Sequence, residues 1–160
     1  MLDTEVGPLI RAQEVERVDT WVKEAAAGGA KICCGGEPLS RSCYRPTVLL
    51  EPPQSSKVST QEAFGPVVCV YAYDDLEEAI ARANHPTFSF HAAIFTRDLN
   101  TAFRAYRLLD ASAVIVNDHT AFRVDWMPFA GLRQSGLGVG GIPYTFRDMQ
   151  FEKMFVGLIS

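Results

Sequence analysis

The sequence predicts an α/β fold whose sheet is built from parallel βαβ units. Through the middle of the chain, short β-branched apolar runs alternate with amphipathic stretches that have helical spacing. One of these runs, residues 66–73, is apolar and β-rich, as is typical of a strand whose two faces are both covered. With 160 residues, 48% of them hydrophobic, the chain is long enough to build a core.

The N-terminal part predicts one helix followed by two strands. Residues 13–27 carry valine and alanine at helical spacing, and a Gly-Gly pair ends this helix. Residues 30–34 predict a short strand. Residues 47–50 predict a second strand, which a Pro-Pro pair terminates.

The middle of the chain predicts strands and helices in alternation. This order favours parallel pairing, because a helix returns the chain to the edge of the sheet from which it left. The expected elements are strand 66–73, helix 76–83, strand 91–95, helix 99–109 and strand 112–117.

The character of the sequence changes after residue 117. Residues 118–144 are rich in glycine, proline, aromatic and charged side chains and show little periodicity, which indicates a functional loop rather than a simple connector. Residues 151–159 predict a last strand that has no hairpin partner within this sequence.

Composition excludes several classes of protein. The 15 basic and 19 acidic residues give a net charge of -4, and the basic ones form no stripe, so a nucleic-acid partner is not expected. The apolar runs are too short to span a bilayer, and the first ten residues do not resemble a signal peptide. The four cysteines lack the C-x-x-C spacing of metal or redox sites, so we expect no metal and interpret them as buried or half-buried free thiols of a cytoplasmic protein.

The pattern G-x-G-x-x-G occurs at residues 136–141 but is not interpreted as a dinucleotide-binding turn. Such a turn needs a strand before it and a helix N-terminus after it. Here Arg133 to Ser135 precede it and Ile142-Pro143 follow it, so a glycine-rich surface turn is the better interpretation.

Residues 61–66, Q-E-A-F-G-P, are a candidate for nucleotide contact. Glu62 could accept hydrogen bonds from two ribose hydroxyls, while Phe64 packs on a flat ring. Local chemistry leaves open the alternative that Glu62 is simply a solvated residue before a turn.

Residues 122–126, F-R-V-D-W, are a candidate for anion recognition. Arg123 could bind an anionic substrate with two parallel hydrogen bonds. The alternative is a surface ion pair between Arg123 and Asp125, which would contribute little.

Several motifs together carry a family resemblance. They are V-G-P-L-I at 6–10, E-A-F-G-P at 62–66, A-A-I-F-T at 92–96, V-N at 116–117 and P-F-A-G-L-R-Q-S-G-L-G at 128–138. In this order and at these separations they resemble the C-terminal part of the aldehyde dehydrogenase superfamily, over essentially the whole chain. Gln61, Ser89 and Ala130 depart from the usual pattern, but none of them replaces Glu62 or Phe64.

The resemblance implies the following assignments. Residues 1–150 correspond to the C-terminal part of the catalytic, cofactor-contacting region, with Glu62 and Phe64 contacting NAD or NADP. Residues 151–160 correspond to an oligomerisation strand, so a homo-oligomer is expected. Residues 117–127 and 141–144 look most like the phosphonoacetaldehyde dehydrogenase group, which implies that Phe122 and Arg123 lie at the mouth of an aldehyde tunnel and contact a small, anionic aldehyde.

The family's reacting groups are not found in this sequence. Its thiol nucleophile lies in a G-Q-x-C segment, its general base in an E-L-G-G segment, and an asparagine completes its oxyanion site. None of these segments occurs here, so no catalytic residue is assigned and the chain alone is expected to be inactive. We expect the missing segments and the nucleotide-binding domain to precede Met1. The alternatives are a non-catalytic binding or scaffolding module of the same fold and, further behind, a nucleotide-binding domain built on residues 136–141.

Overall fold

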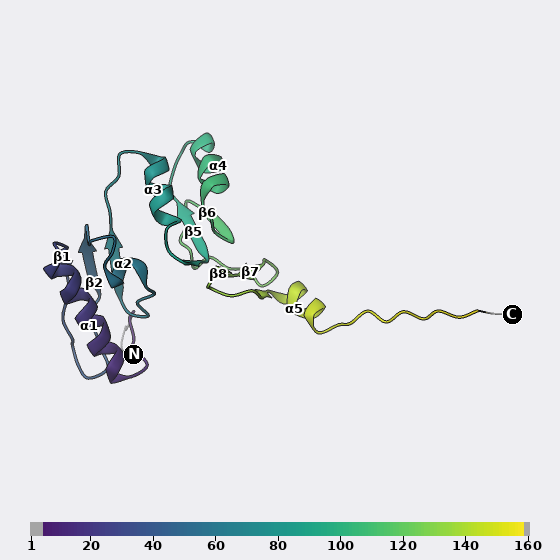
Figure 1. The fold of residues 1–160 in the computed structure, drawn as a ribbon, viewed down its shortest axis with the longest axis horizontal. Helices are drawn as coiled ribbons and strands as arrows, with labels where there is room; N and C mark the ends of the chain where they lie inside the picture. The colour runs from purple at the N-terminus through teal and green to yellow at the C-terminus, as the bar shows by residue number, and fades with distance from the viewer. Residues whose placement is uncertain (1–4, 159–160) are drawn as a thin grey trace. The chain divides into compact units, whose positions relative to one another are not determined.

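The computed structural model describes residues 5–158, and the chain divides into two compact units, Met1–Leu76 and Glu77–Ser160. Each unit has α-helices and short strands, in agreement with the α/β fold class (Figure 1). Within residues 5–158, no helix combines the length and hydrophobicity needed to cross a membrane.

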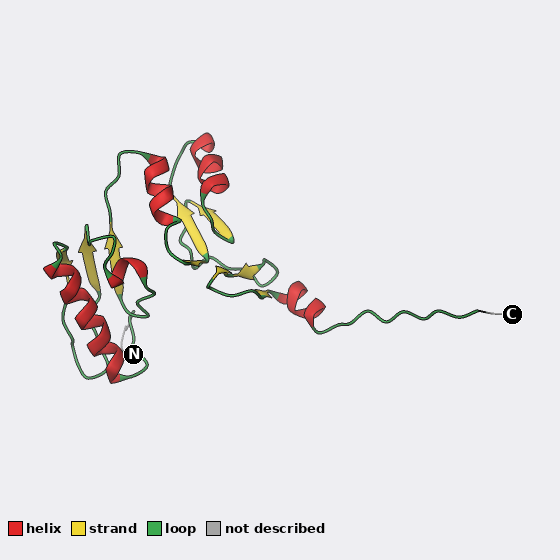
Figure 2. Ribbon diagram, viewed as in Figure 1, coloured by secondary structure: helices red, strands yellow, loops and turns green. Residues whose placement is uncertain are grey.

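The first unit packs a long helix against a three-stranded sheet. Helix α1 (Ala12–Ala27) precedes the strands β1 (Lys31–Cys34), β2 (Thr47–Leu50) and β3 (Val67–Val70), which lie in the order β1-β2-β3 (Figure 2). The predicted helix and strands are confirmed. Strands β2 and β3 are parallel, but β1 and β2 are antiparallel, so this sheet is mixed rather than purely parallel.

The core of this unit follows from the spacing of apolar residues along α1. The buried side chains of the helix recur every three or four residues and therefore share one face. That face packs with residues from the loop and the sheet in a cluster that contains Val15, Val18, Val22, Ala25, Ala30, Tyr44 and Leu49. A four-residue helix, α2 (Lys57–Thr60), was not predicted, because one turn is too short to show a helical period.

The second unit contains a parallel βαβ element. Strand β5 (His91–Ile94), helix α4 (Leu99–Leu108) and strand β6 (Ala113–Val116) follow one another, and His91 lies opposite Ala113 in the parallel pair. The Asp98 carboxylate caps α4 by accepting from the backbone N–H of Thr101 at 2.8 Å. Helix α3 (Leu76–Ala83) precedes this element, as predicted.

Residues 118–144 are more ordered than their sequence indicated. They contain β7 (Phe129–Ala130), β8 (Leu132–Arg133) and β9 (Val139–Gly140). Strand β8 pairs with β4 (Phe88–Ser89), and β7 pairs with β9, both antiparallel. Two-residue strands carry no detectable alternation, so pattern reasoning could not find them.

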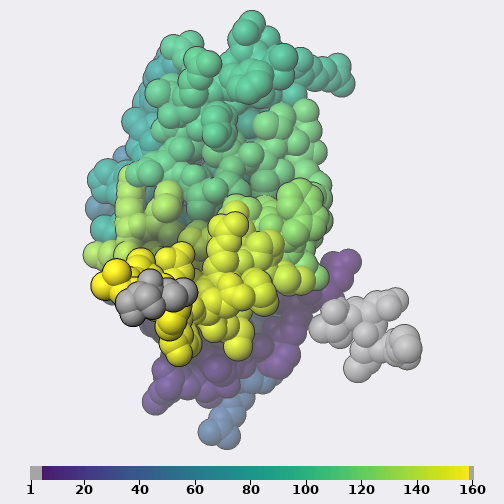
Figure 3. All heavy atoms as spheres, turned by 90° about the vertical axis from the view of Figure 1, so that its right-hand side faces the viewer, coloured from purple at the N-terminus to yellow at the C-terminus, as the bar shows by residue number. Residues whose placement is uncertain are grey.

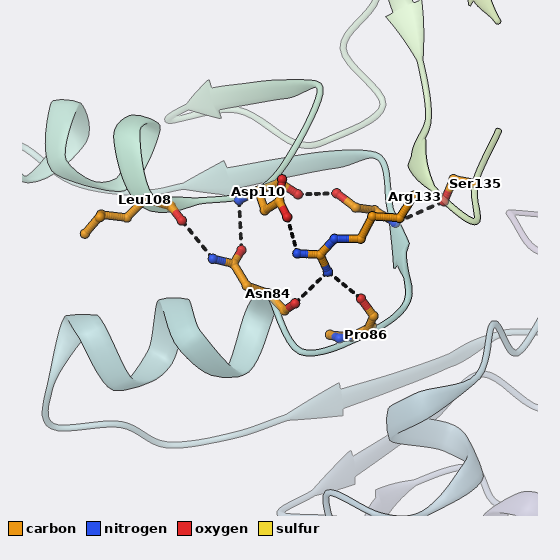
Figure 4. Close-up of polar contacts among 7 residues, drawn as sticks. Asn84, Pro86, Leu108, Asp110, Arg133 and Ser135 are labelled. Atoms are coloured by element: carbon orange, nitrogen blue, oxygen red, sulfur yellow. Dashed lines mark hydrogen bonds and ion pairs between the residues drawn. The ribbon is translucent and has the colours of Figure 1, made fainter. Parts of the chain in front are cut away.

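A polar network ties β8 to the α3–β4 and α4–β6 connections (Figure 4). Arg133 donates to the carbonyl oxygens of Asn84 and Pro86, each at 2.7 Å, and forms an ion pair with Asp110. The Asn84 side chain donates to the Leu108 carbonyl at 2.7 Å and accepts from the Asp110 N–H at 2.8 Å. The network therefore fixes the position of β8, which lies within the P-F-A-G-L-R-Q-S-G segment.

One prediction about the glycine-rich turn was wrong in part. A helix, α5 (Ile142–Asp148), does follow residues 136–141, with proline in its first turn. Proline suits this position because the first N–H groups of a helix have no intrahelical partner. The rejection of a dinucleotide-binding turn still has support, because β8 before the motif and β9 inside it are two-residue strands in antiparallel pairs, not strands of a parallel βαβ unit.

Residues 151–158 form no strand in this chain, and their side chains are exposed. Figure 3 shows the atoms of the C-terminal part of the described chain, in yellow, on the face turned to the viewer. A strand requires a pairing partner, so the predicted oligomerisation strand at 151–160 stays a prediction, and its last two residues lie outside the described part of the chain.

The four cysteines are free, as expected, but Cys33 and Cys34 are exposed rather than buried. They lie on β1 at the edge of its sheet, where one side of the strand has no neighbouring strand among residues 5–158. Among residues 5–158, no three His, Cys, Asp or Glu side chains are grouped so that they could hold a metal ion.

Candidate functional site

The predicted site residues lie in two places, one in each unit. Glu62 and Phe64 belong to the turn between α2 and β3 in the first unit, and Phe122 and Arg123 belong to the segment after β6 in the second.

The turn of the first unit presents an aromatic ring to solvent. Phe64 has a positive φ of 43°, and its side chain is 75% exposed. The left-handed backbone region is unfavourable for a bulky residue, so neighbouring contacts must hold this conformation. Glu62 is also exposed, and its carboxylate makes no hydrogen bond to another described residue.

Helix α1 holds this turn on both sides of Phe64. The Arg17 guanidinium donates to the Ala63 carbonyl at 2.5 Å. On the other side, Gly65 lies so close to α1 that a Cβ at this position would approach a methyl carbon of Val18 to 2.9 Å. The ring of Phe64 is therefore held outward by the adjacent backbone, and the turn offers a flat apolar face next to an acceptor carboxylate.

Arg17 is itself held by the helix that carries it. Its guanidinium lies 4.4 Å from the centroid of the Trp21 ring, and its Nε donates to Glu14 at 2.7 Å. The hydrogen bonds from Arg17 and then Arg11 hold the pKa of Glu14 below its ordinary value. The hydrogen bond to Glu14 therefore helps to orient Arg17 toward the turn.

In the second unit, Phe122 and Arg123 line one cavity of about 460 Å³. Its walls come from the start of β5, from residues 120–123 and from β7. The lining residues are Phe90, His91, Thr120, Ala121, Phe122, Arg123 and Phe129. Aromatic rings thus surround a cavity in which Arg123 supplies the positive charge.

Arg123 stacks on an aromatic ring instead of pairing with an acid. Its guanidinium carbon lies 4.1 Å from the centroid of Phe129, which corresponds to a cation–π contact. Among the described residues, no ion pair forms between Arg123 and Asp125, which was the alternative considered from sequence. Its N–H donors therefore remain available to an anion.

Sequence reasoning missed His91 and Thr120 in this cavity. The His91 ring Nδ1 lies 3.0 Å from the Thr120 carbonyl oxygen, and the ring contacts Phe90 and Phe129. The sequence offers little signal, because His91 opens an apolar strand and its partner lies 29 residues later.

None of the four cysteines lines this cavity. Cys69, the one nearest in sequence to Glu62, is partly buried against Val58, and burial raises the pKa of its thiol. That is opposite to the shift that activates a nucleophile. The Cys69 thiol therefore lacks the environment of an activated nucleophile.

Comparison with known proteins shows the family of this chain. The profile of the aldehyde dehydrogenase family matches residues 1–155. The 3-sulfolactaldehyde dehydrogenase of Priestia megaterium is 42% identical over 153 residues, covering 96% of this chain but 32% of the relative.

Solved structures of aldehyde dehydrogenases are also similar to this chain. Aldehyde dehydrogenase 21 from Physcomitrella patens, in complex with succinate, aligns with a TM-score of 0.89 at 38% identity, over 93% of this chain and 31% of that one. The glyceraldehyde-3-phosphate dehydrogenase GapN of Methanocaldococcus jannaschii, complexed with NADP, aligns with a TM-score of 0.85 at 35% identity, over 91% and 31%. This chain spans about a third of the length of each of these proteins, and it belongs to the aldehyde dehydrogenase family.

Proposed function

We propose that this chain supplies cofactor- and aldehyde-contacting walls of an NAD(P)-dependent aldehyde dehydrogenase that oxidises a small anionic aldehyde to its carboxylate. The observation that carries the proposal is Arg123, whose guanidinium lies on Phe129 in an aromatic cavity and pairs with no acid among the described residues. A charged group in such a place is typical of a site that recognises one end of a small ligand.

The turn at 61–66 fits the cofactor role. The Glu62 carboxylate can accept hydrogen bonds from ribose hydroxyls, and Phe64 offers one face to a planar ring. When bound, NAD or NADP would accept the hydride that the aldehyde carbon gives up. The contacts of α1 keep Phe64 in position before any ligand arrives, which lowers the cost of ordering the site.

The second unit fits an aldehyde that carries a phosphonate or a sulfonate. Both groups have several oxygens, and a guanidinium can bind two of them at once. Sequence resemblance favours the phosphonate, and the name of the Priestia megaterium relative specifies a sulfonated aldehyde. The shared chemistry is a small aldehyde with an oxyanion at its far end.

The chemical step needs groups that this chain lacks. We expect no dehydrogenase activity from it alone, because the G-Q-x-C and E-L-G-G segments do not occur in its sequence. Its expected partners are the polypeptide that carries the nucleophile and nucleotide-binding domain, and further copies that pair through residues 151–160.

A chimera tests the proposal. In it, this chain replaces the matching C-terminal third of the Priestia megaterium enzyme, and kcat/KM is measured for phosphonoacetaldehyde, sulfoacetaldehyde and propanal. Replacing Arg123 by alanine is expected to lower the preference for the anionic aldehydes about 10- to 150-fold, since a hydrogen bond to a charged group contributes roughly 1.5–3 kcal/mol. Arg123→Lys keeps the charge and should recover part of the preference.

Two results would contradict the proposal. An Arg123→Ala chimera with an unchanged preference would remove the anion role. NADH or NADPH formation by the isolated chain with any of these aldehydes would show that the reacting groups are present after all.

A further inference from the structure

The Arg123 cavity contains a histidine whose two ring nitrogens differ in their contacts. His91 Nδ1 lies 3.0 Å from the Thr120 carbonyl oxygen, and a carbonyl can only accept, so Nδ1 carries the hydrogen. Nε2 is buried and has no hydrogen-bond partner among the described residues. The contact with Thr120 therefore decides which way the ring faces.

Aromatic contacts hold the same ring in place. The His91 ring meets Phe129 edge-on, with centroids 5.5 Å apart at 89°, and meets Phe90 at 4.6 Å. Phe129 is also the ring on which the Arg123 guanidinium lies. The His91 imidazole therefore packs against the same Phe129 ring on which the Arg123 guanidinium lies.

The imidazole also anchors the segment that carries Arg123. Thr120 lies three residues before Arg123, and the other described hydrogen bonds of residues 119–122 stay within residues 118–122. These are the Phe122 N–H to the His119 carbonyl at 3.1 Å, the Ala121 N–H to the His119 ring at 3.2 Å and the His119 N–H to the Asp118 carboxylate at 2.7 Å. The bond to His91 ties this turn to the first residue of β5.

We propose that His91 is a positioning residue that orients Arg123 for the anionic end of the substrate. It acts through two connections, the Nδ1–H bond to Thr120 and the ring contact with Phe129. Without this bond, residues 119–122 have no described hydrogen bond to β5, and Arg123 samples orientations that do not meet the oxyanion. This inference rests on the proposed role of Arg123, and it adds a residue that determines substrate selectivity.

Three variants of His91 separate the hydrogen bond to Thr120 from the ring contact with Phe129. His91→Asn places an amide donor near the position of Nδ1, His91→Gln places one near Nε2, and His91→Phe keeps an aromatic ring without either nitrogen. In the chimera, the Phe and Gln variants should lower the ratio of kcat/KM for phosphonoacetaldehyde to that for propanal about 3- to 10-fold, the range for one neutral hydrogen bond. His91→Asn should recover most of this ratio. Recovery by Gln instead of Asn, or an unchanged ratio in the Phe variant, would overturn the proposal.

A second readout uses the 160-residue chain itself and does not depend on turnover. NMR of the ring nitrogens of neutral His91 should show a protonated Nδ1 and an unprotonated Nε2, and the opposite tautomer would contradict the geometry. The two proposals fail differently. If Arg123→Ala changes selectivity but His91→Phe does not, only the role of His91 is lost. If Arg123→Ala has no effect, the anion role itself is lost.

Discussion

The positive φ of Phe64 predicts an inverted order of stability for two small substitutions. At most positions alanine stabilises a chain relative to glycine, because glycine loses more backbone freedom on folding. At Phe64, with φ at 43°, we expect the Phe64→Gly variant to be more stable than Phe64→Ala. Both variants remove the ring, so the loss of its contacts cancels in the comparison.

The magnitude follows from two opposing effects. The left-handed conformation costs an L-residue with a Cβ about 1–2 kcal/mol, and glycine avoids this cost. Glycine in turn loses roughly 0.5–1 kcal/mol through its greater freedom in the unfolded chain. The difference leaves Phe64→Gly ahead by about 0.5–1 kcal/mol.

Urea unfolding of the first unit measures this difference. The chain has two tryptophans, so replacing Trp126 by phenylalanine leaves Trp21 on α1 as the sole tryptophan reporter. The matched control is Lys23 in α1, where glycine should be less stable than alanine by about 1 kcal/mol. If Phe64→Ala equals or exceeds Phe64→Gly while the Lys23 pair shows the ordinary order, the backbone at Phe64 is not strained and the reasoning is wrong.

Two further predictions concern the second unit. Hydrogen bonds from the Thr101 side chain and backbone lower the pKa of Asp98, so its contribution to stability is complete above the ordinary aspartate pKa of about 3.9 and is lost as the pH falls through the lower value of the folded state. Thermal unfolding should therefore show a smaller loss of stability on acidification for Asp98→Asn, which keeps the cap without titrating, and an equal loss in both proteins would refute the assignment. Arg133→Lys should destabilise this unit by about 1 kcal/mol, because an ammonium cannot donate to the Pro86 carbonyl and pair with Asp110 in the same planar geometry, and an unchanged midpoint in urea would contradict this.

The regular elements could be predicted because their signals are local. Helix α1 repeats valine on one face and ends at a glycine pair, and α4 begins after an aspartate cap. The two-residue strands could not be predicted, because β4 and β8 pair residues that lie more than forty positions apart. The helix after the glycine-rich turn was missed because proline was interpreted as a stop, whereas it occupies a first-turn position.

The candidate site also has one part that could be predicted from the sequence and one part that could not. Phe122 and Arg123 were assigned from resemblance, and the structure places both on one cavity. Sequence gave no indication of His91 or of the anchor from Arg17 to the turn at 61–66, because each depends on a contact between segments far apart in the chain. The residue types in a sequence indicate which side chains could bind a ligand. The residues that position those side chains are identified from contacts in the structure.

Each unit holds an exposed side chain in place through contacts of its neighbours. The first holds Phe64 in an unfavourable backbone conformation with most of its ring exposed, and the second leaves the donors of Arg123 without an acid among the described residues. We propose that a cofactor contacts Phe64 and that an anionic aldehyde contacts Arg123. We therefore expect substitutions of Arg123 and His91 to change substrate selectivity rather than stability.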